Sequence, residues 1–381
     1  MTETPELFPA SYQAARSRFR DELPRVQARW PAAHLARHAV AGDETTTIDW
    51  IEAPATGQQE KLLILTTGEH GIEGYVGAAM LQLFIEAYLP RLAPANTGLL
   101  LIHAINPWGM AHRRRTNAAN VDLNRTFIWD AGDAPAERLY DATFNPGYDQ
   151  LMPLLNPRGA VRSLAWSRLA FAARLLRALV TVGPGRLKAI TLEGQYRHPQ
   201  GIYFGGRTVP EETAVLMRLF RAHIARYRQI LHLDMHTGYG PRYQMSLVNS
   251  RWEPRASTEL AQRFAYPLVV KTTPNEFYAL RGDMIDWVYT LQREAFPDKQ
   301  LYATSFEFGA YGDSILAGLR SMRTMVEENR LYWHGVNPPA EARIRDAFAE
   351  LYAPGDARWR AKAVADAHVA FSGILTAERF A

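Results

Sequence analysis

Apolar, strand-like runs alternate along this chain with segments long enough to form helices, and this alternation restricts the possible folds more than any other feature. The pattern predicts strands near residues 61–67, 98–105, 229–235, 244–248, 267–272 and 302–308, and helices near 73–89, 211–228, 255–265, 282–295 and 314–333. Long connections between strands favour a mixed, mostly parallel central sheet with helices on both faces. We therefore predict an α/β fold whose functional residues gather beyond the carboxyl ends of the strands.

The segment KLLILTTGEHGIE, residues 61–73, places two metal-ligand side chains directly after a predicted strand. His70 and Glu73 suit Zn²⁺, and a catalytic zinc needs three protein ligands and one open position. His236 in LHLDMHTGYG is the best third candidate, because it also follows an apolar strand and precedes a glycine turn. An HxxE pair is a weak indication by itself, but its position and His236 favour a metal site over a structural role. The chain has no cysteine, which excludes thiolate ligands and disulfides.

Three consecutive arginines, Arg113–Arg115, follow the strand-like run GLLLIHAINP. A nucleic-acid interface needs a wider basic surface, ideally with aromatic side chains that stack on bases. Here Asp122 and other polar residues follow at once. We therefore expect no nucleic-acid partner. Arginine suits the binding of a substrate carboxylate or of the oxyanion formed when water adds to a carbonyl.

A further carboxylate, Glu307, ends the strand-like run in YATSFEFGAYG. Such a residue often caps a turn. A zinc hydrolase, however, requires a general base that takes a proton from water and later gives it to the leaving amine. Outside the ligand pair, only Glu307 has a comparable position beside glycine at a strand end, so it is the predicted base.

The order of these elements resembles that of the zinc carboxypeptidase superfamily. Its pattern is HxxE, an Arg nine residues before an Asn-Arg pair, a His after a strand, a Tyr and then a Glu, and all are present in this order. The phrases HGIEG, NVDLNRTF, DMHTGYG and FEFG look like a bacterial branch of that superfamily known as a domain of unknown function. The resemblance covers roughly residues 9–335 and implies a zinc carboxypeptidase-like fold.

The resemblance also implies a role for each matching residue. It implies one Zn²⁺ per chain on His70, Glu73 and His236; Glu307 as the general base; Arg115 polarising the scissile carbonyl; Asn124 and Arg125 gripping a terminal carboxylate; Asp122 behind a zinc-bound histidine; and Tyr278 and Ile285 contacting the substrate. Ile285 matches the position that sets side-chain preference, which suggests an apolar pocket. The mobile tyrosine of carboxypeptidases precedes an Asp-Trp pair by eight residues, as Tyr278 does here.

The implied function is a zinc-dependent hydrolase that cleaves an amide or peptide bond next to a free carboxylate, as metallocarboxypeptidases do. The alternative is an N-acyl amino acid deacylase resembling aspartoacylase or succinylglutamate desuccinylase, which share the zinc site and the DLNR motif. A non-catalytic carboxylate-binding protein is a weaker alternative, because the base and all ligands are retained. The expected partner is a small peptide or an N-acyl amino acid.

The predicted organisation is a catalytic domain at residues 1–337, with a helical insertion at about 150–200, and a C-terminal helical tail at 338–381. Arginines interrupt the stretch GAVRSLAWSRLAFAARLLRALV, so we expect a solvated helix packed on the core rather than a membrane-surface or partner helix. The start lacks a basic segment followed by an apolar one, and no later run is long enough to span a bilayer. We expect a cytoplasmic protein without a membrane partner.

Overall fold

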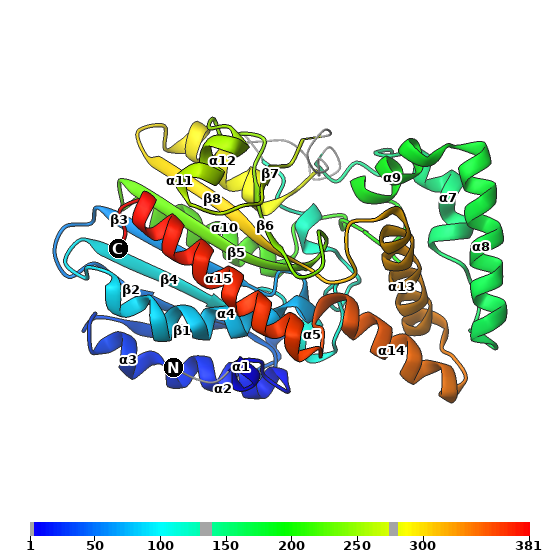
Figure 1. Cartoon of the computed structure of the whole chain (residues 1–381), viewed down its shortest axis with the longest axis horizontal. Coiled ribbons are helices and arrows are strands. Elements are labelled where there is room, and N and C mark those ends of the chain that lie inside the picture. The colour runs from blue at the N-terminus through cyan, green and yellow to red at the C-terminus, as the bar shows by residue number, and fades with distance from the viewer. Residues whose placement is uncertain (1–3, 130–138, 274–280) are drawn as a thin grey trace.

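The computed structural model of the chain describes residues 4–129, 139–273 and 281–381 (Figure 1). These residues form one eight-stranded sheet with the order β1-β2-β4-β3-β5-β8-β6-β7. The strands are β1 His34–Ala39, β2 Thr47–Ala53, β3 Lys61–Thr67, β4 Thr97–His103, β5 Gln229–Gly238, β6 Met245–Asn249, β7 Val269–Lys271 and β8 Gln300–Gly309. The pairs β4-β3, β3-β5, β5-β8 and β6-β7 are parallel, whereas β1-β2, β2-β4 and β6-β8 are antiparallel. The six predicted strands are confirmed.

The helices alternate with these strands as expected. They are α1 Thr4–Leu7, α2 Tyr12–Asp21, α3 Leu23–Gln27, α4 Gly74–Ala87, α5 Pro107–Ala111, α7 Gly147–Leu155, α8 Leu164–Thr181, α9 Pro184–Glu193, α10 Glu211–Ile224, α11 Ser257–Arg263, α12 Met284–Ala295, α13 Ile315–His334, α14 Pro338–Tyr352 and α15 Ala357–Ala377. Short 3-10 helices include η2 Gly71–Glu73 and η4 Leu123–Arg125. The five predicted helices correspond to α4, α10, α11, α12 and α13.

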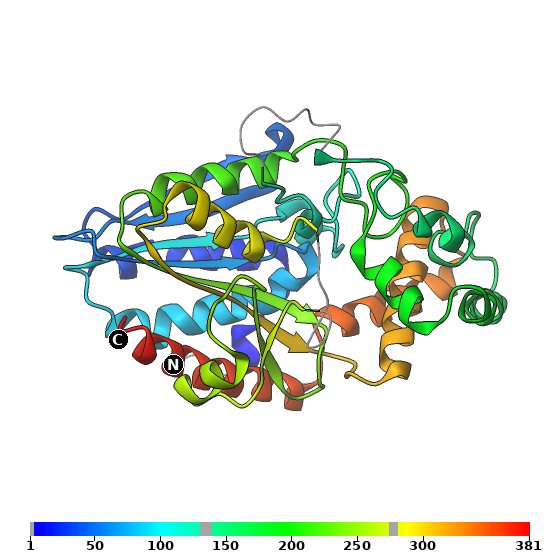
Figure 2. The ribbon, with the colours of Figure 1, turned by 90° about the horizontal axis from the view of Figure 1, so that it is seen from above.

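The sheet is covered on both faces (Figure 2). Successive side chains of a strand point to opposite faces, so Leu63 of β3 packs with α4 and α15, whereas Ile64 packs with α10 and α12. On the first face, the rings of Phe84 in α4 and Phe371 in α15 lie 5.5 Å apart. This arrangement confirms the predicted α/β class with helices on both sides of a mixed sheet.

The C-terminal segment 338–381, predicted as a helical tail, consists of α14 and α15. Helix α15 buries Trp359 and Phe371 in the same core as the central strands. It is therefore integrated with the sheet, although its Ala-rich sequence gives only a faint apolar face.

Helices α7, α8, α9 and α13 form a lobe at one end of the molecule, which we call the helical lobe (Figure 1). The predicted helical insertion at about 150–200 is helical and contributes α7, α8 and α9. Strands β5 and β8 point toward this lobe (Figure 2). Across the described residues, no helix combines the length and the apolar character that crossing a bilayer requires.

Candidate metal centre

A turn between β3 and α4 presents the first two candidate ligands. Gly68 has a φ of +69°, and a Cβ there would lie 2.8 Å from the Cβ of Ala104. A Cβ at Gly71 would lie 2.1 Å from the backbone of Gly109, so only glycine allows this close approach. The tight path lets η2 turn Glu73 back toward His70, and both side chains are buried.

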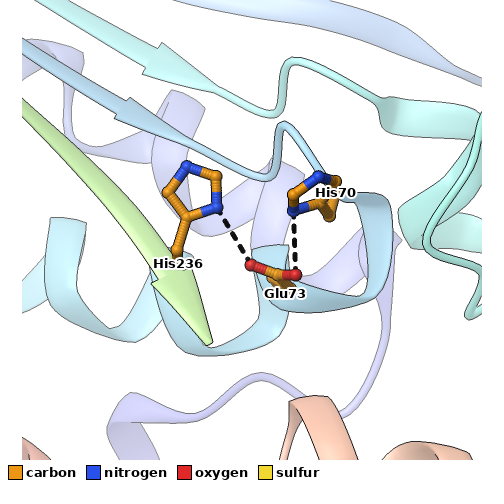
Figure 3. Close-up of side chains that lie close together, drawn as sticks. All are labelled: His70, Glu73 and His236. Atoms are coloured by element: carbon orange, nitrogen blue, oxygen red, sulfur yellow. Dashed lines mark hydrogen bonds and ion pairs between the residues drawn. The ribbon is translucent and has the colours of Figure 1, made fainter. Parts of the chain in front are cut away.

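His70, Glu73 and His236 converge at the carboxyl end of the sheet (Figure 3). His70 Nδ1 lies 2.9 Å from Glu73 Oε1, and His236 Nδ1 lies 3.2 Å from Glu73 Oε2. The three ligand atoms lie within 4.8 Å of one another, and all three residues are buried. The structure therefore brings together the ligands that the sequence predicts.

The donor set fits a zinc ion. His70 Nδ1 has no hydrogen-bond partner among the described residues, although Glu73 Oε1 is only 2.9 Å away. Two imidazole nitrogens and a carboxylate are the three-ligand set of a catalytic zinc site. A buried, unpartnered nitrogen beside a carboxylate is what a cation between them would satisfy.

A carboxylate orients each histidine from behind. His70 Nε2 lies 3.0 Å from Asp122 Oδ1, and His236 Nε2 lies 2.5 Å from Asp234 Oδ2. The contact with Asp234 holds a proton on Nε2 of His236, whereas Nε2 of His70 also lies 2.6 Å from Nη2 of Arg115, and both Nδ1 atoms face Glu73. Asp122 thus lies where the resemblance places it. Asp234 is an addition, and the D-x-H spacing on a strand could have revealed it, because residues i and i+2 share a face.

A second acidic group lies on the other side of His236. Glu69, Asp234 and His236 also come within 4.8 Å of one another. Burial raises the pKa of Glu69 well above its ordinary value. Neither Glu69 nor Asp234 lines the cavity described below. The Nδ1 side of His236, which lines it, is therefore the candidate metal site.

Neighbouring positive charges lower the pKa of two carboxylates in the site. Burial favours neutral carboxyls, but His70 and His236 hold the pKa of Glu73 well below its ordinary value. Arg115 and Arg125 overcome burial in the same way and hold the pKa of Asp122 well below its ordinary range. These two carboxylates are therefore charged near neutral pH.

Glu307 differs from Glu73 and Asp122, because its pKa is raised. It is the register partner of His236 between β5 and β8, and its Oε1 accepts a hydrogen bond of 3.0 Å from the Tyr239 N–H. Burial, helped by the charge of Glu73, raises the pKa of Glu307 to about 7. A carboxyl that titrates near neutral pH can both accept and release a proton, as a general base must.

Arg115 lies between the candidate ligand Glu73 and Asp122, the carboxylate behind His70. Its Nη1 lies 3.0 Å from Glu73 Oε1, and its Nε lies 3.2 Å from Asp122 Oδ2. The side chain is buried but lines the same cavity as His70 and Glu307. Two carboxylates thus fix a permanent positive charge at the cavity wall.

The remaining predicted residues occupy different positions. Asn124 lines the cavity, and its Nδ2 donates to Asp283 Oδ2 at 3.1 Å. Arg125 lies behind this wall with 1% exposure and donates from Nη1 to the Asn124 carbonyl at 2.7 Å. Ile285 lines the cavity. Tyr278 lies outside the described residues.

The cavity has a volume of about 40 Å³. Besides the predicted residues, polar side chains line it, and these were not predicted from the sequence: Asn249, Ser250, Thr272, Asp283 and Ser305. Most of them lie at or just beyond the ends of β6 and β7 or near the end of β8. The ends of strands were the available indication, but the sequence does not show which polar side chains there face the same cavity.

The chain matches a family model and is similar to several solved structures. A family model described as "Protein of unknown function (DUF2817)" matches residues 8–366. No curated protein matches the chain. Among solved structures, carboxypeptidase A from Helicoverpa armigera is similar over 90% of this chain and 74% of its own, with 14% identity and a TM-score of 0.46.

A metallo-carboxypeptidase from Pseudomonas aeruginosa covers 95% of this chain and 69% of its own, with 14% identity and a TM-score of 0.43. A protein from Shewanella amazonensis, named after the succinylglutamate desuccinylase/aspartoacylase family, covers 78% of this chain and 72% of its own, with 18% identity and a TM-score of 0.37. No residue role follows from similarities at this level. The family match spans most of the sequence, and the chain therefore belongs to the DUF2817 family.

Proposed function

We propose that this protein is a zinc-dependent hydrolase that cleaves an amide bond next to a free carboxylate in a short substrate, in the manner of a metallocarboxypeptidase. The observation that carries the proposal is the convergence of two Nδ1 atoms and a carboxylate, on His70, His236 and Glu73, in a cavity that Glu307 and Arg115 also line. Ligands, a base and an oxyanion-binding group then occupy one site.

His70, Glu73 and His236 would hold the zinc. A bound Zn²⁺ lowers the pKa of water and polarises a carbonyl. Glu307 is the group that takes the proton from water and returns it to the leaving amine, because its pKa of about 7 suits both steps. The Tyr239 N–H fixes its Oε1 at 3.0 Å, which keeps the carboxylate directed along the cavity wall.

Arg115 supplies positive charge where negative charge develops on the carbonyl oxygen. Its ion pairs with Glu73 and Asp122 hold it in place before the substrate arrives, so little reorganisation accompanies the reaction. Its position in a buried wall strengthens the electrostatic effect, since water screens charges less there.

We assign the substrate carboxylate to Asn124 and Arg125. Asn124 faces the cavity, whereas Arg125 acts from behind it, through its hydrogen bond with the Asn124 carbonyl and through its charge. The same residues would bind the carboxylate of a short peptide or of an N-acyl amino acid, so deacylation is the second candidate function.

The test is turnover of a panel of di- and tripeptides and N-acyl amino acids, followed by mass spectrometry. Activity should be lost after chelation and restored by Zn²⁺. Release of C-terminal amino acids from peptides would support the peptidase, and release of free acids from N-acyl amino acids would support the deacylase. Turnover that persists fully after complete metal removal would contradict both.

A further inference from the structure

Helix α8 lies at the outer edge of the helical lobe, with the rest of the lobe on its inner side (Figure 1). Its packed face buries Phe171 and Ala178, which are seven residues apart. Arg168 joins this inner face and lies 3.0 Å from Glu327 of α13. The contacts of α8 with the lobe are therefore confined to one side of the helix.

The opposite side of α8 carries a continuous apolar stripe. Trp166, Leu169, Leu176 and Val180 are 73%, 59%, 63% and 79% exposed. With the exposed Ala173 they follow one another at intervals of three and four residues, which aligns them along one side of the helix. We call these five residues the α8 stripe.

A stripe of this kind is unusual on a surface facing only water. Burial of one large apolar side chain is worth about 1.5–3 kcal/mol, so leaving four exposed forgoes a large stabilisation. Single exposed apolar residues are ordinary, but contiguous ones mark an interaction surface. The α8 stripe therefore indicates a partner.

Charge identifies the kind of partner. Residues 150–192 contain no aspartate or glutamate, but they contain seven cationic side chains, namely Arg158, Arg162, Arg168, Arg174, Arg177, Arg186 and Lys188. Among the described residues, only Arg168 of these forms an ion pair. Arg162 precedes the helix and Arg177 borders the α8 stripe, and both are exposed. The segment that carries the stripe is therefore cationic, and no ion pair within the described residues balances Arg162 or Arg177.

We propose that α8 docks on the surface of an anionic lipid bilayer. A helix of this kind lies in the plane of the interface with its apolar residues between the acyl chains and its cations among the phosphates. The α8 stripe and its bordering arginines supply both parts. This proposal is independent of the proposed hydrolase activity. It departs from the expectation of no membrane partner. That expectation assumed that the arginines interrupt the apolar face, but in the structure they lie beside the stripe or behind it.

Two other occupants fit the observations less well. A second copy of the chain would cover the α8 stripe, but it would bring two cationic segments without carboxylates against each other. Nucleic acid would match the charge, but it would leave the aliphatic side chains of the stripe without a suitable contact. The bilayer satisfies the apolar and the cationic residues together.

The test is flotation of the full chain with vesicles of phosphatidylcholine alone and of phosphatidylcholine mixed with phosphatidylserine. We expect binding only to the mixed vesicles, weakened by salt. Trp166→Ser combined with Leu176→Ser should reduce vesicle affinity about tenfold or more, because two inserted side chains are lost. The matched control, Trp252→Ser combined with Val369→Ser, removes a tryptophan and an aliphatic residue that are 42% and 47% exposed and lie outside the helical lobe.

Both double variants change exposed residues, so circular dichroism should show unchanged folding. Failure of the wild type to float with anionic vesicles would overturn the proposal, as would equal binding by the α8 variant. Light scattering gives the remaining outcome. A wild-type dimer that the α8 variant, but not the control, converts to monomers would show that a second copy covers the stripe and would also overturn the proposal.

Discussion

The metal centre and the α8 stripe depart in opposite ways from the usual division between an apolar interior and a polar surface. At the carboxyl end of the sheet, Glu73, Asp122 and Arg115 are buried and charged. On α8, Trp166 and Val180 are large, apolar and more than two-thirds exposed. Buried charge costs free energy unless it is paired, and exposed apolar area costs free energy unless a partner covers it. We propose a metal and a substrate as the partners of the first region, and an anionic bilayer as the partner of the second.

The largest expected effect concerns the metal centre alone. Glu307→Gln removes the group that accepts a proton, so turnover should fall by about 10²–10⁴-fold while the metal content stays unchanged. Vesicle binding should also stay unchanged, which would separate the two regions. Glu294→Gln, on the exposed side of α12, is the matched control. Full activity of Glu307→Gln on the best substrate, measured by mass spectrometry, would contradict the assigned base.

The second prediction compares the two sides of α8. Phe171→Ala empties a packed position and should lower the free energy of unfolding by about 3 kcal/mol, roughly 10²-fold in the unfolding equilibrium. Trp166→Ala removes a larger ring but should cost less than about 0.5 kcal/mol, because that ring faces solvent. Urea unfolding followed by circular dichroism gives both values. Equal losses would mean that the stripe is packed against the protein.

The third prediction tests the carboxylates behind the ligands. Asp122→Asn should weaken metal binding about 10–100-fold, because His70 Nε2 loses a charged acceptor and Arg115 loses an ion pair. Competition with a chromophoric chelator measures the affinity. Asp234→Asn, behind His236, should act in the same direction. An unchanged metal affinity in both variants would show that these two carboxylates do not support the metal ligands.

The smallest effect is a pH dependence that only one region should show. The carboxylate of Glu307 accepts the proton, and its pKa is about 7, so kcat/KM should fall about tenfold per pH unit below that value. A bound cation favours the carboxylate, which moves the midpoint toward lower pH. Vesicle binding should be insensitive over the same range, because arginine and lysine stay charged. A flat activity profile down to about pH 4 would exclude Glu307 as the titrating base.

The convergence of the candidate ligands could be predicted from the sequence because they follow or end buried strands. The apolar runs before His70, His236 and Glu307 are marked clearly, and parallel neighbours in the sheet bring their carboxyl ends together. The contact between Asp234 and His236 could be predicted only from the rule that side chains two residues apart on a strand point to the same face. No residue pattern near Glu69 predicted its contact with His236, because this contact depends on how β3 and β5 pair.

Other features depend on packing that the sequence does not specify locally. Strand β1, HLARHA, was missed because it is mostly half-buried or exposed and has no apolar run. Strand β2, TIDWIEA, was missed because charged residues interrupt its apolar ones. On α8 the composition showed arginines among apolar residues but not which side packs. The lobe uses Phe171 and Ala178 for packing and leaves Trp166 and Leu176 exposed, a division that the expectation of a solvated helix packed on the core did not specify.

The most direct test of the account is the metal content of the purified chain by elemental analysis, with wild type beside His236→Ala and His34→Ala. His34 is exposed and lies outside the centre, so its variant controls for the loss of a histidine. We predict about one zinc per chain in the wild type and in His34→Ala, and loss of zinc in His236→Ala. Zinc retained in full by His236→Ala, or no metal in the wild type after Zn²⁺ is supplied, would contradict the assigned centre.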